Sequence, residues 1–313
     1  MTTQVRDTTP APGPPPAAGP GRHRLRYLLG ILGPGLITGA ADDDPSGIAT
    51  YTQTGAQFGY GQLWTALWML PLVTGVQEAC GRIGNITGQG LARNIKEMYS
   101  LRTLRVLVIL LAAANVINIG ADIGALGAAA ALIIHVPVAV LMIGFTGLIL
   151  ALEIYVSYRR YAKALEPLVH TFPHAGLIAQ GLFAIGIVSL GMLAIPVMAG
   201  STSYALSEAR GKKEGLDLKP REGRYFYGVI AASMLIGLCL NFIGVNPIRF
   251  LVFAAAFNGV AAIPLIWFID RIAADRTTMG AARSGRLSRV VLLLTVLGMA
   301  GAVVAMIISF VAG

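Results

Sequence analysis

The sequence predicts an all-α, polytopic membrane protein with a broken first helix. Of its 313 residues, 55% are hydrophobic and only 12% are charged, and the mean hydropathy is +0.70. Soluble domains carry about 25% charged residues. The 38 glycines fit a membrane protein, because small residues let membrane helices approach closely. The basic residues, which give a net charge of +9, lie between apolar segments. That pattern indicates membrane topology rather than nucleic-acid binding.

Long apolar segments account for most of the chain after residue 26. At 1.5 Å per residue, each reaches across about 30 Å of hydrocarbon, although the first does so only as two halves. We expect residues 1–26, which are rich in Pro, Ala and Gly, to form a disordered cytoplasmic tail. The eight apolar segments are residues 27–56, 62–81, 104–134, 137–156, 175–206, 225–244, 248–269 and 289–311.

Residues 42–47, Asp-Asp-Asp-Pro-Ser-Gly, interrupt the first segment. A charged side chain at membrane depth costs about 2.5–3.5 kcal/mol, so acids there are rare and usually line a pathway. Pro45 has no backbone N–H to donate, and Gly47 permits unusual backbone angles. This pattern predicts a broken helix whose carbonyls and carboxylates meet a cation. The alternative is an acidic turn that faces water at the end of a short helix.

Lysine and arginine counts give an orientation for the first four segments. Basic residues precede the first segment, are absent after it, and follow the second and fourth. Since basic loops stay in the cytoplasm, we expect a cytoplasmic N-terminus, with the chain in a bacterial inner membrane. The alternation then fails. Residues 157–174 and 207–224 are both basic, yet only segment 175–206 separates them.

Three explanations for this failure are open. Segment 175–206 enters and leaves the membrane on one side, or the loop 157–174 is drawn outside despite its charge. In the third explanation, an odd number of spans is missing relative to an ancestor.

Several stretches resemble the Nramp (natural resistance-associated macrophage protein) family of divalent metal transporters, and most closely its branch of magnesium transporters. The first stretch, residues 33–51, is the most specific. This resemblance covers most of the chain after residue 26. Its other stretches are residues 56–60, 82–91, 118–122, 199–201, 219–222 and 226–230.

The resemblance implies the leucine-transporter fold, in which two inverted five-helix repeats hold metal between broken helices one and six. Residues 27–156 match the family's first four spans, and 175–313 match its eighth to eleventh. The fifth to seventh spans are then absent. The join then falls between about Glu166 and Gly181, in or just after the basic loop 157–174. Three is an odd number, which agrees with the charge pattern. The chain therefore resembles a partial leucine-transporter-like bundle that lacks half of its metal site.

The remaining half suggests a cation site made of oxygen ligands. Family members typically carry Asp-Pro-Gly-Asn in the first helix and a methionine in the sixth. The aspartate aligns with Asp44, and Gly47 stands at the asparagine position. The candidate metal ligands are Asp44, Asp43 and Ser46, with backbone carbonyls. Hard oxygen ligands favour Mg²⁺ or Mn²⁺, in agreement with the magnesium branch.

Asp122 is the fourth candidate metal ligand. It lies within a span, near Asn118 and Asn115, which share roughly one helix face. It is suited to completing the cation site or to relaying protons, and a polar helix–helix contact is the plainer alternative. For two other acids we expect ion pairs: Glu78 with Arg82, and Glu153 with Arg159 and Arg160.

The leading functional hypothesis is a secondary carrier of divalent metal ions that works in a lipid bilayer and is not an enzyme. The metal is the transported substrate, and no cofactor is expected. Two alternatives remain: a truncated, transport-defective member or partner subunit, and, more remotely, an intramembrane Mg²⁺-dependent transferase. The chain has no Walker A motif, so ATP-driven transport is not expected. The sequence leaves the metal, proton coupling and oligomeric state open.

Overall fold

A computed structural model describes residues 44–155, 177–244 and 246–312 of the chain. Within these ranges the protein consists of helices and connecting loops, without a strand. Six of the helices are long and apolar enough to cross a membrane. The predicted fold class, an all-α polytopic membrane protein, is therefore confirmed. These six helical spans are Leu101–Ala131, Val138–Tyr155, Ala184–Arg210, Arg224–Ile243, Arg249–Ala274 and Arg286–Met306.

The described helices follow the predicted apolar segments closely. In the first half they are α2 (Pro45–Phe58), η1 (Gly59–Gln62), α3 (Leu63–Thr87), α4 (Leu91–Met98), α5 (Leu101–Ala131) and α6 (Val138–Tyr155). In the second half they are α8 (Leu177–Arg210), α9 (Arg224–Leu240), η3 (Asn241–Ile243), α10 (Pro247–Ala274), α11 (Arg276–Met279), η4 (Gly280–Ala282) and α12 (Arg286–Ala312).

Capping residues explain where several helices begin and end. Ser100 caps α5 by accepting a hydrogen bond from the backbone N–H of Thr103, at 3.2 Å. Asp275 caps α11 in the same way through the N–H of Thr278, at 2.8 Å. Gly88 ends α3 with a φ of 62°, a left-handed conformation that glycine adopts without steric cost. These helix ends are therefore set by local capping residues that can be recognised in the sequence.

Helix α3 departs from the prediction in one respect. Its 25 residues are long enough to cross a bilayer, but it is not among the six sufficiently apolar helices. Its second half contains Gln77, Glu78 and Arg82, which lower the hydropathy. The predicted ion pair between Glu78 and Arg82 is confirmed, with a distance of 2.9 Å between Nε and Oε1.

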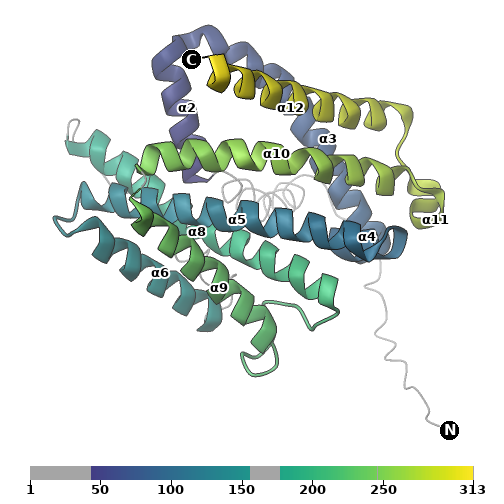
Figure 1. Cartoon of the computed structure of the whole chain (residues 1–313), viewed down its shortest axis with the longest axis horizontal. Coiled ribbons are helices and arrows are strands. Elements are labelled where there is room, and N and C mark those ends of the chain that lie inside the picture. The colour runs from purple at the N-terminus through teal and green to yellow at the C-terminus, as the bar shows by residue number, and fades with distance from the viewer. Residues whose placement is uncertain (1–43, 156–176, 245, 313) are drawn as a thin grey trace, which may run out of the picture. The chain divides into compact units, whose positions relative to one another are not determined.

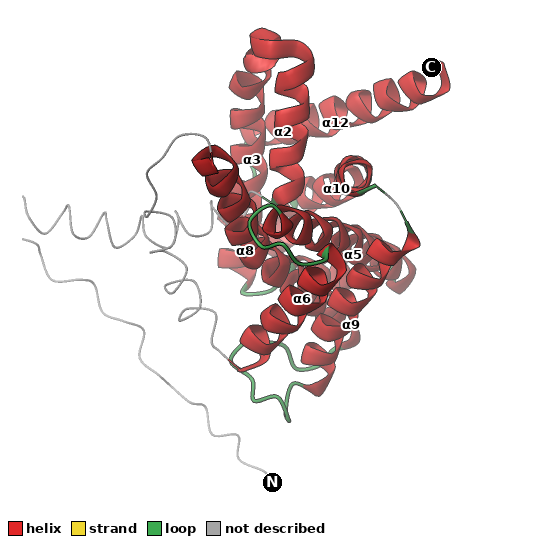
Figure 2. Cartoon of the chain, turned by 90° about the vertical axis from the view of Figure 1, so that its left-hand side faces the viewer, coloured by secondary structure: helices red, strands yellow, loops and turns green. Residues whose placement is uncertain are grey.

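Helix α5 is the centre of the described bundle. It packs against α8, α9, α10 and α6, and Figures 1 and 2 show α6 and α9 on one side of it and α3 and α12 on the other. Glycines permit the closest approach. A Cβ added to Gly237 of α9 would lie 2.9 Å from the backbone nitrogen of Gly120. The two helix backbones are therefore in direct contact, as is usual where membrane helices meet at small residues.

Contacts between α5 and its neighbours reveal the direction of each helix. Along α5 the partner on α8 moves backwards: Asn115 bonds Thr202, and Leu126 lies against Gly191. Helices α5 and α8 are therefore antiparallel. Helix α6 returns from a short turn after α5, with Met142 beside Gly127, and is also antiparallel to α5. It follows that α6 and α8 run in the same direction.

Each of the other consecutive long helices from α3 onward reverses direction. The end of α8 and the start of α9 meet where Ser203 donates to the carbonyl of Phe226. Helix α10 starts beside α5 at Phe250 and ends near α3, where Ile272 and Ile83 share a core cluster. The step from Tyr155 to Leu177 is thus the place where the described chain leaves one end of the bundle and reappears at the other.

One end of the bundle gathers the positive charge, and we call it the basic end. It comprises α4, the loop 211–223 and the connection 275–285. Arg82 of α3 joins this end by donating to the carbonyl of Ala282, at 2.9 Å. Among the described residues, every lysine and arginine except Arg249 lies at or near this end. Helix α6 ends at Tyr155 and α8 ends at Arg210, and both helices end toward the basic end (Figure 1).

This arrangement bears on the failure of charge alternation. From residue 177 onward, segment 175–206 belongs to α8, a continuous helix of 34 residues that is about 51 Å long at 1.5 Å per residue. A segment that turns back to its own side would need a reversal, and α8 has none. The structure therefore disfavours the first of the three explanations. The connecting residues 156–176, and with them Arg159, Arg160, Glu166 and most of the predicted join, lie outside the described residues.

Candidate functional site

Asp44 lies at the N-terminus of a helix that begins near the middle of the bundle. Its Oδ1 accepts a hydrogen bond from the backbone N–H of Gly47, at 2.7 Å, so Asp44 is the N-cap of α2. Pro45 follows at the first helical position, where its missing N–H costs nothing. Gly47 is an ordinary helical residue that supplies the donor, instead of the unusual backbone angles expected from the sequence.

The side-chain amide of Asn118 connects Asp44 with helices α5 and α8. The side-chain nitrogen of Asn118, near the middle of α5, donates to Oδ2 of Asp44. The same nitrogen lies 3.0 Å from the sulfur of Met198 on α8. Pro45 packs against Gly191 of α8 as well. The start of α2 is therefore held between α5 and α8, halfway along both helices, which is the depth expected for the centre of a bilayer.

Further polar residues extend this region along α5. Asn115 donates to Oγ1 of Thr202, at 3.0 Å, and to the carbonyl of Met198, at 3.3 Å. The predicted face shared by Asn115 and Asn118 is confirmed, and both contact α8. Asp122 follows one turn after Asn118 and is fully buried. Asn115 therefore makes a polar contact between α5 and α8.

The other predicted ligands are described only in part. Asp43 and Asp42 lie outside the described residues. Ser46 is in the first turn of α2, and its side chain is outside what the structure describes. Within the described part of the chain, no group of three or more His, Cys, Asp or Glu residues is arranged to hold a metal ion.

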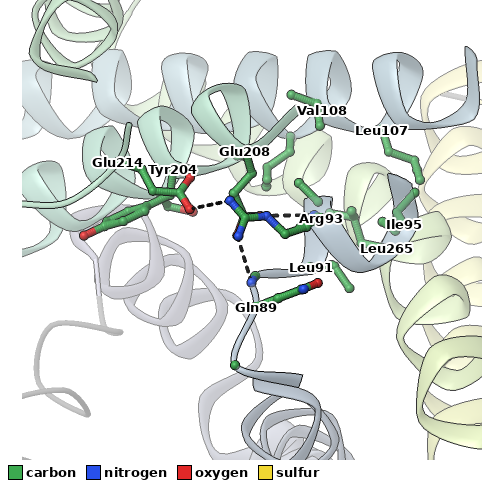
Figure 3. A pocket seen from close by; sticks show the side chains of 16 residues that line it. Gln89, Leu91, Arg93, Ile95, Leu107, Val108, Tyr204, Glu208, Glu214 and Leu265 are labelled. Carbon is green, nitrogen blue, oxygen red and sulfur yellow. Dashed lines mark hydrogen bonds and ion pairs between the residues drawn. The ribbon is translucent and has the colours of Figure 1, made fainter. Parts of the chain in front are cut away.

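A cavity of about 480 Å³ lies at the basic end, between α4, α5, α8 and α10. Figure 3 shows Tyr204 and Glu214 on one side of it and Ile95, Leu107 and Leu265 on the other, with Arg93 between the two groups. Its lining reaches Leu111 on α5 and Ser201 on α8. These residues are one turn from Asn115 and Met198, respectively. The cavity therefore leads from the basic end toward the polar residues in the middle of the bundle.

Two carboxylates and one arginine form the polar side of this cavity. Glu208, which is buried, accepts hydrogen bonds from the backbone N–H groups of Gly90, at 2.8 Å, and Arg93, at 3.2 Å. It thereby satisfies the start of α4. Glu214 forms an ion pair with Arg93 at 3.4 Å. Burial, together with repulsion from Glu208, raises the pKa of Glu214, and Arg93 opposes this shift.

The fold and the intramembrane polar residues define the class of this protein. It is an integral, multi-pass α-helical membrane protein with a helix start buried in its centre. A sequence model of the Nramp family, described as natural resistance-associated macrophage protein-like, matches residues 35–172 and 172–309. Since these matches cover most of the chain, it belongs to the Nramp family. Members of this family are transporters of divalent metal cations, not enzymes.

Sequence reasoning missed Met198. A methionine in an apolar span ordinarily fills space, and nothing in its local sequence marks it. It could have been found only by knowing that α8 packs against α5 with Met198 level with Asn118. Glu208 was missed for a similar reason, because its partners at Gly90 and Arg93 are more than a hundred residues away in the sequence.

Proposed function

We propose that this chain binds a divalent cation at the start of α2 and acts as a secondary carrier in the bacterial inner membrane. The observation that carries the proposal is the position of Asp44. Its carboxylate lies at the centre of the bundle, at a helix start, beside a buried amide on α5. Acids at this depth are costly and usually belong to a transport pathway, and broken helices supply ion sites in secondary transporters.

The metal that we propose first is Mg²⁺ or Mn²⁺. Asp44, Asp43 and Ser46 offer oxygen ligands, which suit these ions. Asp122, buried one turn from Asn118, is proposed as a further ligand or as a proton relay. We also propose that the basic end faces the cytoplasm, because lysine and arginine concentrate there. The cavity at that end would then be the cytoplasmic route to the site.

A second candidate function rests on the parallel direction of α6 and α8. We propose that an odd number of spans is missing between them, corresponding to the family's fifth to seventh. Two observations support this proposal: the family matches meet at residue 172, and the directions of all other consecutive long helices described alternate. A chain that lacks these spans would bind the cation without transporting it, or would serve as a partner subunit. Flux measurements in proteoliposomes separate this candidate from the carrier.

The experiment that tests cation binding is isothermal titration of the purified protein with Mn²⁺ and Mg²⁺. We expect Asp44→Asn to weaken binding by at least about tenfold, since it removes the negative charge that a buried cation needs. Asp217→Asn, which changes an exposed carboxylate in the loop at the basic end, should bind as the wild type does. Unchanged binding by Asp44→Asn would overturn the proposal.

A further inference from the structure

The side-chain amide of Asn118 occupies an unusual position between two electron-pair donors. Its nitrogen donates to a carboxylate oxygen of Asp44 and lies 3.0 Å from the sulfur of Met198. Three helices thus converge on one point: Asp44 precedes α2, Asn118 belongs to α5 and Met198 to α8. The Asp44 oxygen and the Met198 sulfur both lie beside the positively polarised NH₂ group of Asn118. Two such electron-pair donors are also arranged to bind a cation in its place.

The oxygen at the other end of this amide is buried. Asn118 is only 2% exposed, and its Oδ1 has no hydrogen-bond partner among the described residues. Leaving a buried acceptor unsatisfied costs about 1–3 kcal/mol. An amide has donors on one end and an acceptor on the other, so a half-turn of the side chain exchanges them. That turn would bring the unsatisfied oxygen toward Asp44 and Met198.

We propose that Asn118 and Met198 are cation ligands, and that the Asn118 amide holds the site in its metal-free form. In the empty protein the NH₂ group stands in for the cation between Asp44 and Met198. When a cation enters, the amide turns and supplies its oxygen, which completes a set of carboxylate oxygen, amide oxygen and thioether sulfur. This proposal rests on the proposed function and specifies the ligands and the class of metal.

Met198 is held in place for such a role. Its backbone carbonyl accepts hydrogen bonds from Oγ1 of Thr202, at 2.9 Å, and from Asn115, at 3.3 Å. The sulfur is a soft ligand, and soft ligands bind Mg²⁺ poorly. A site with one thioether therefore favours borderline and soft divalent ions over Mg²⁺, so Mn²⁺ is preferred of the two metals proposed above.

The test compares Cd²⁺, a soft probe ion, with Mg²⁺ by isothermal titration of the full chain in detergent. Met198→Leu keeps an apolar side chain of similar size and removes only the sulfur. We expect it to weaken Cd²⁺ binding by on the order of tenfold and to leave Mg²⁺ binding nearly unchanged. The matched control is Met234→Leu, because Met234 is a buried methionine of the same core cluster on α9. It should bind both ions as the wild type does.

X-ray absorption at the cadmium edge supplies a measurement that packing changes do not affect. The wild type and Met234→Leu should show a sulfur neighbour of bound Cd²⁺, and Met198→Leu should not. Asn118→Leu should weaken binding of both ions, because it removes the amide oxygen.

The possible outcomes separate the two proposals. Loss of both ions in Asp44→Asn, together with unchanged Cd²⁺ affinity in Met198→Leu or no sulfur neighbour in the wild type, would overturn this inference and leave the proposed function standing. Equal weakening in Met198→Leu and Met234→Leu would also overturn it, since packing would then explain the effect. Failure of the wild type to bind either ion would overturn the proposed function itself.

Discussion

The carboxylates of this protein show how strongly position decides the role of a side chain. Asp44 and Asp275 both cap helices through a backbone N–H three residues later. Asp44 does so in the centre of the bundle beside Asn118, and Asp275 does so at the basic end, where hydrogen bonds from Thr277 and Thr278 lower its pKa. The same capping geometry therefore serves as a candidate ion ligand in one place and as a simple loop anchor in the other.

Glu214 gives a prediction at the residue scale. Its pKa is raised above 4.5 in the folded protein by burial and by Glu208. The folded state therefore binds a proton more tightly than the unfolded state, and ionisation of Glu214 lowers stability as the pH rises above its ordinary pKa. We expect Glu214→Gln to gain stability relative to the wild type as the pH rises above the ordinary pKa of a glutamate, because the variant has no charge to lose stability by.

Thermal unfolding in detergent at a series of pH values measures this difference. Glu222→Gln, which changes an exposed glutamate of the same loop, is the control and should follow the wild type at every pH. If the difference between Glu214→Gln and the wild type shrank as the pH rose, the direction of the shift would be wrong.

Some residues of the candidate site could be predicted from the sequence, and others could not. The three aspartates, Pro45 and the following glycine indicated a helix interruption, because their cost or geometry is local. Asn118 and Asp122 were found because they are polar in an apolar span. Met198 was not, because a methionine is common in apolar spans whether or not its sulfur contacts a polar group such as Asn118. Only the tertiary packing of α5 against α8 distinguishes the two cases.

At the element scale, the bundle depends on close backbone contact between α5 and α9. A Cβ on Gly237 would approach the backbone nitrogen of Gly120 and the carbonyl of Val116, at 2.9 and 3.2 Å. Neither atom belongs to a flexible side chain that can move aside. The apolar segments themselves were predictable from hydropathy, but which helices touch, and at which glycines, depends on long-range packing.

Gly237→Ala should therefore destabilise the protein. Forcing an extra methyl group into a packed interior typically costs about 1–3 kcal/mol, here because α5 and α9 must separate. Gly228→Ala, on the same helix, is the matched control, because open space surrounds it. It should be neutral or more stable by about 0.5–1 kcal/mol, since alanine favours helix. Equal melting temperatures for the two variants would contradict the described contact.

At the scale of the whole molecule, the positions of the basic residues and the directions of the helices indicate the same arrangement of the two halves. Both Tyr155, at the end of α6, and the loop after α8 lie at the basic end, and α6 and α8 are parallel. The sequence revealed the conflict in charge alternation and left three explanations. The directions of the described helices fit a missing odd number of spans. With an odd number missing, both halves of the chain keep their basic loops at the same end of the bundle.

Cysteine accessibility in sealed vesicles tests this arrangement. After replacement of Cys80 and Cys239 by serine, we expect Tyr155→Cys and Lys212→Cys to react with an impermeant reagent from the same side. Both positions are exposed at the basic end. Asn246→Cys, in the exposed turn before α10, should react from the opposite side. Labelling of positions 155 and 212 from opposite sides would mean that one half of the bundle is inverted.

The parallel course of α6 and α8 has a consequence for how this protein enters the membrane during synthesis. The insertion machinery receives the spans one after another, and a new span normally enters opposite to the one before it. Arg159, Arg160 and Lys163 would hold the end of α6 in the cytoplasm, and the basic loop after α8 would demand the same side. Both basic loops would then have to stay on the same side of the membrane. A single crossing between them cannot keep both on one side. Its biogenesis should accordingly be slow and sensitive to the charge of the residues between 157 and 174.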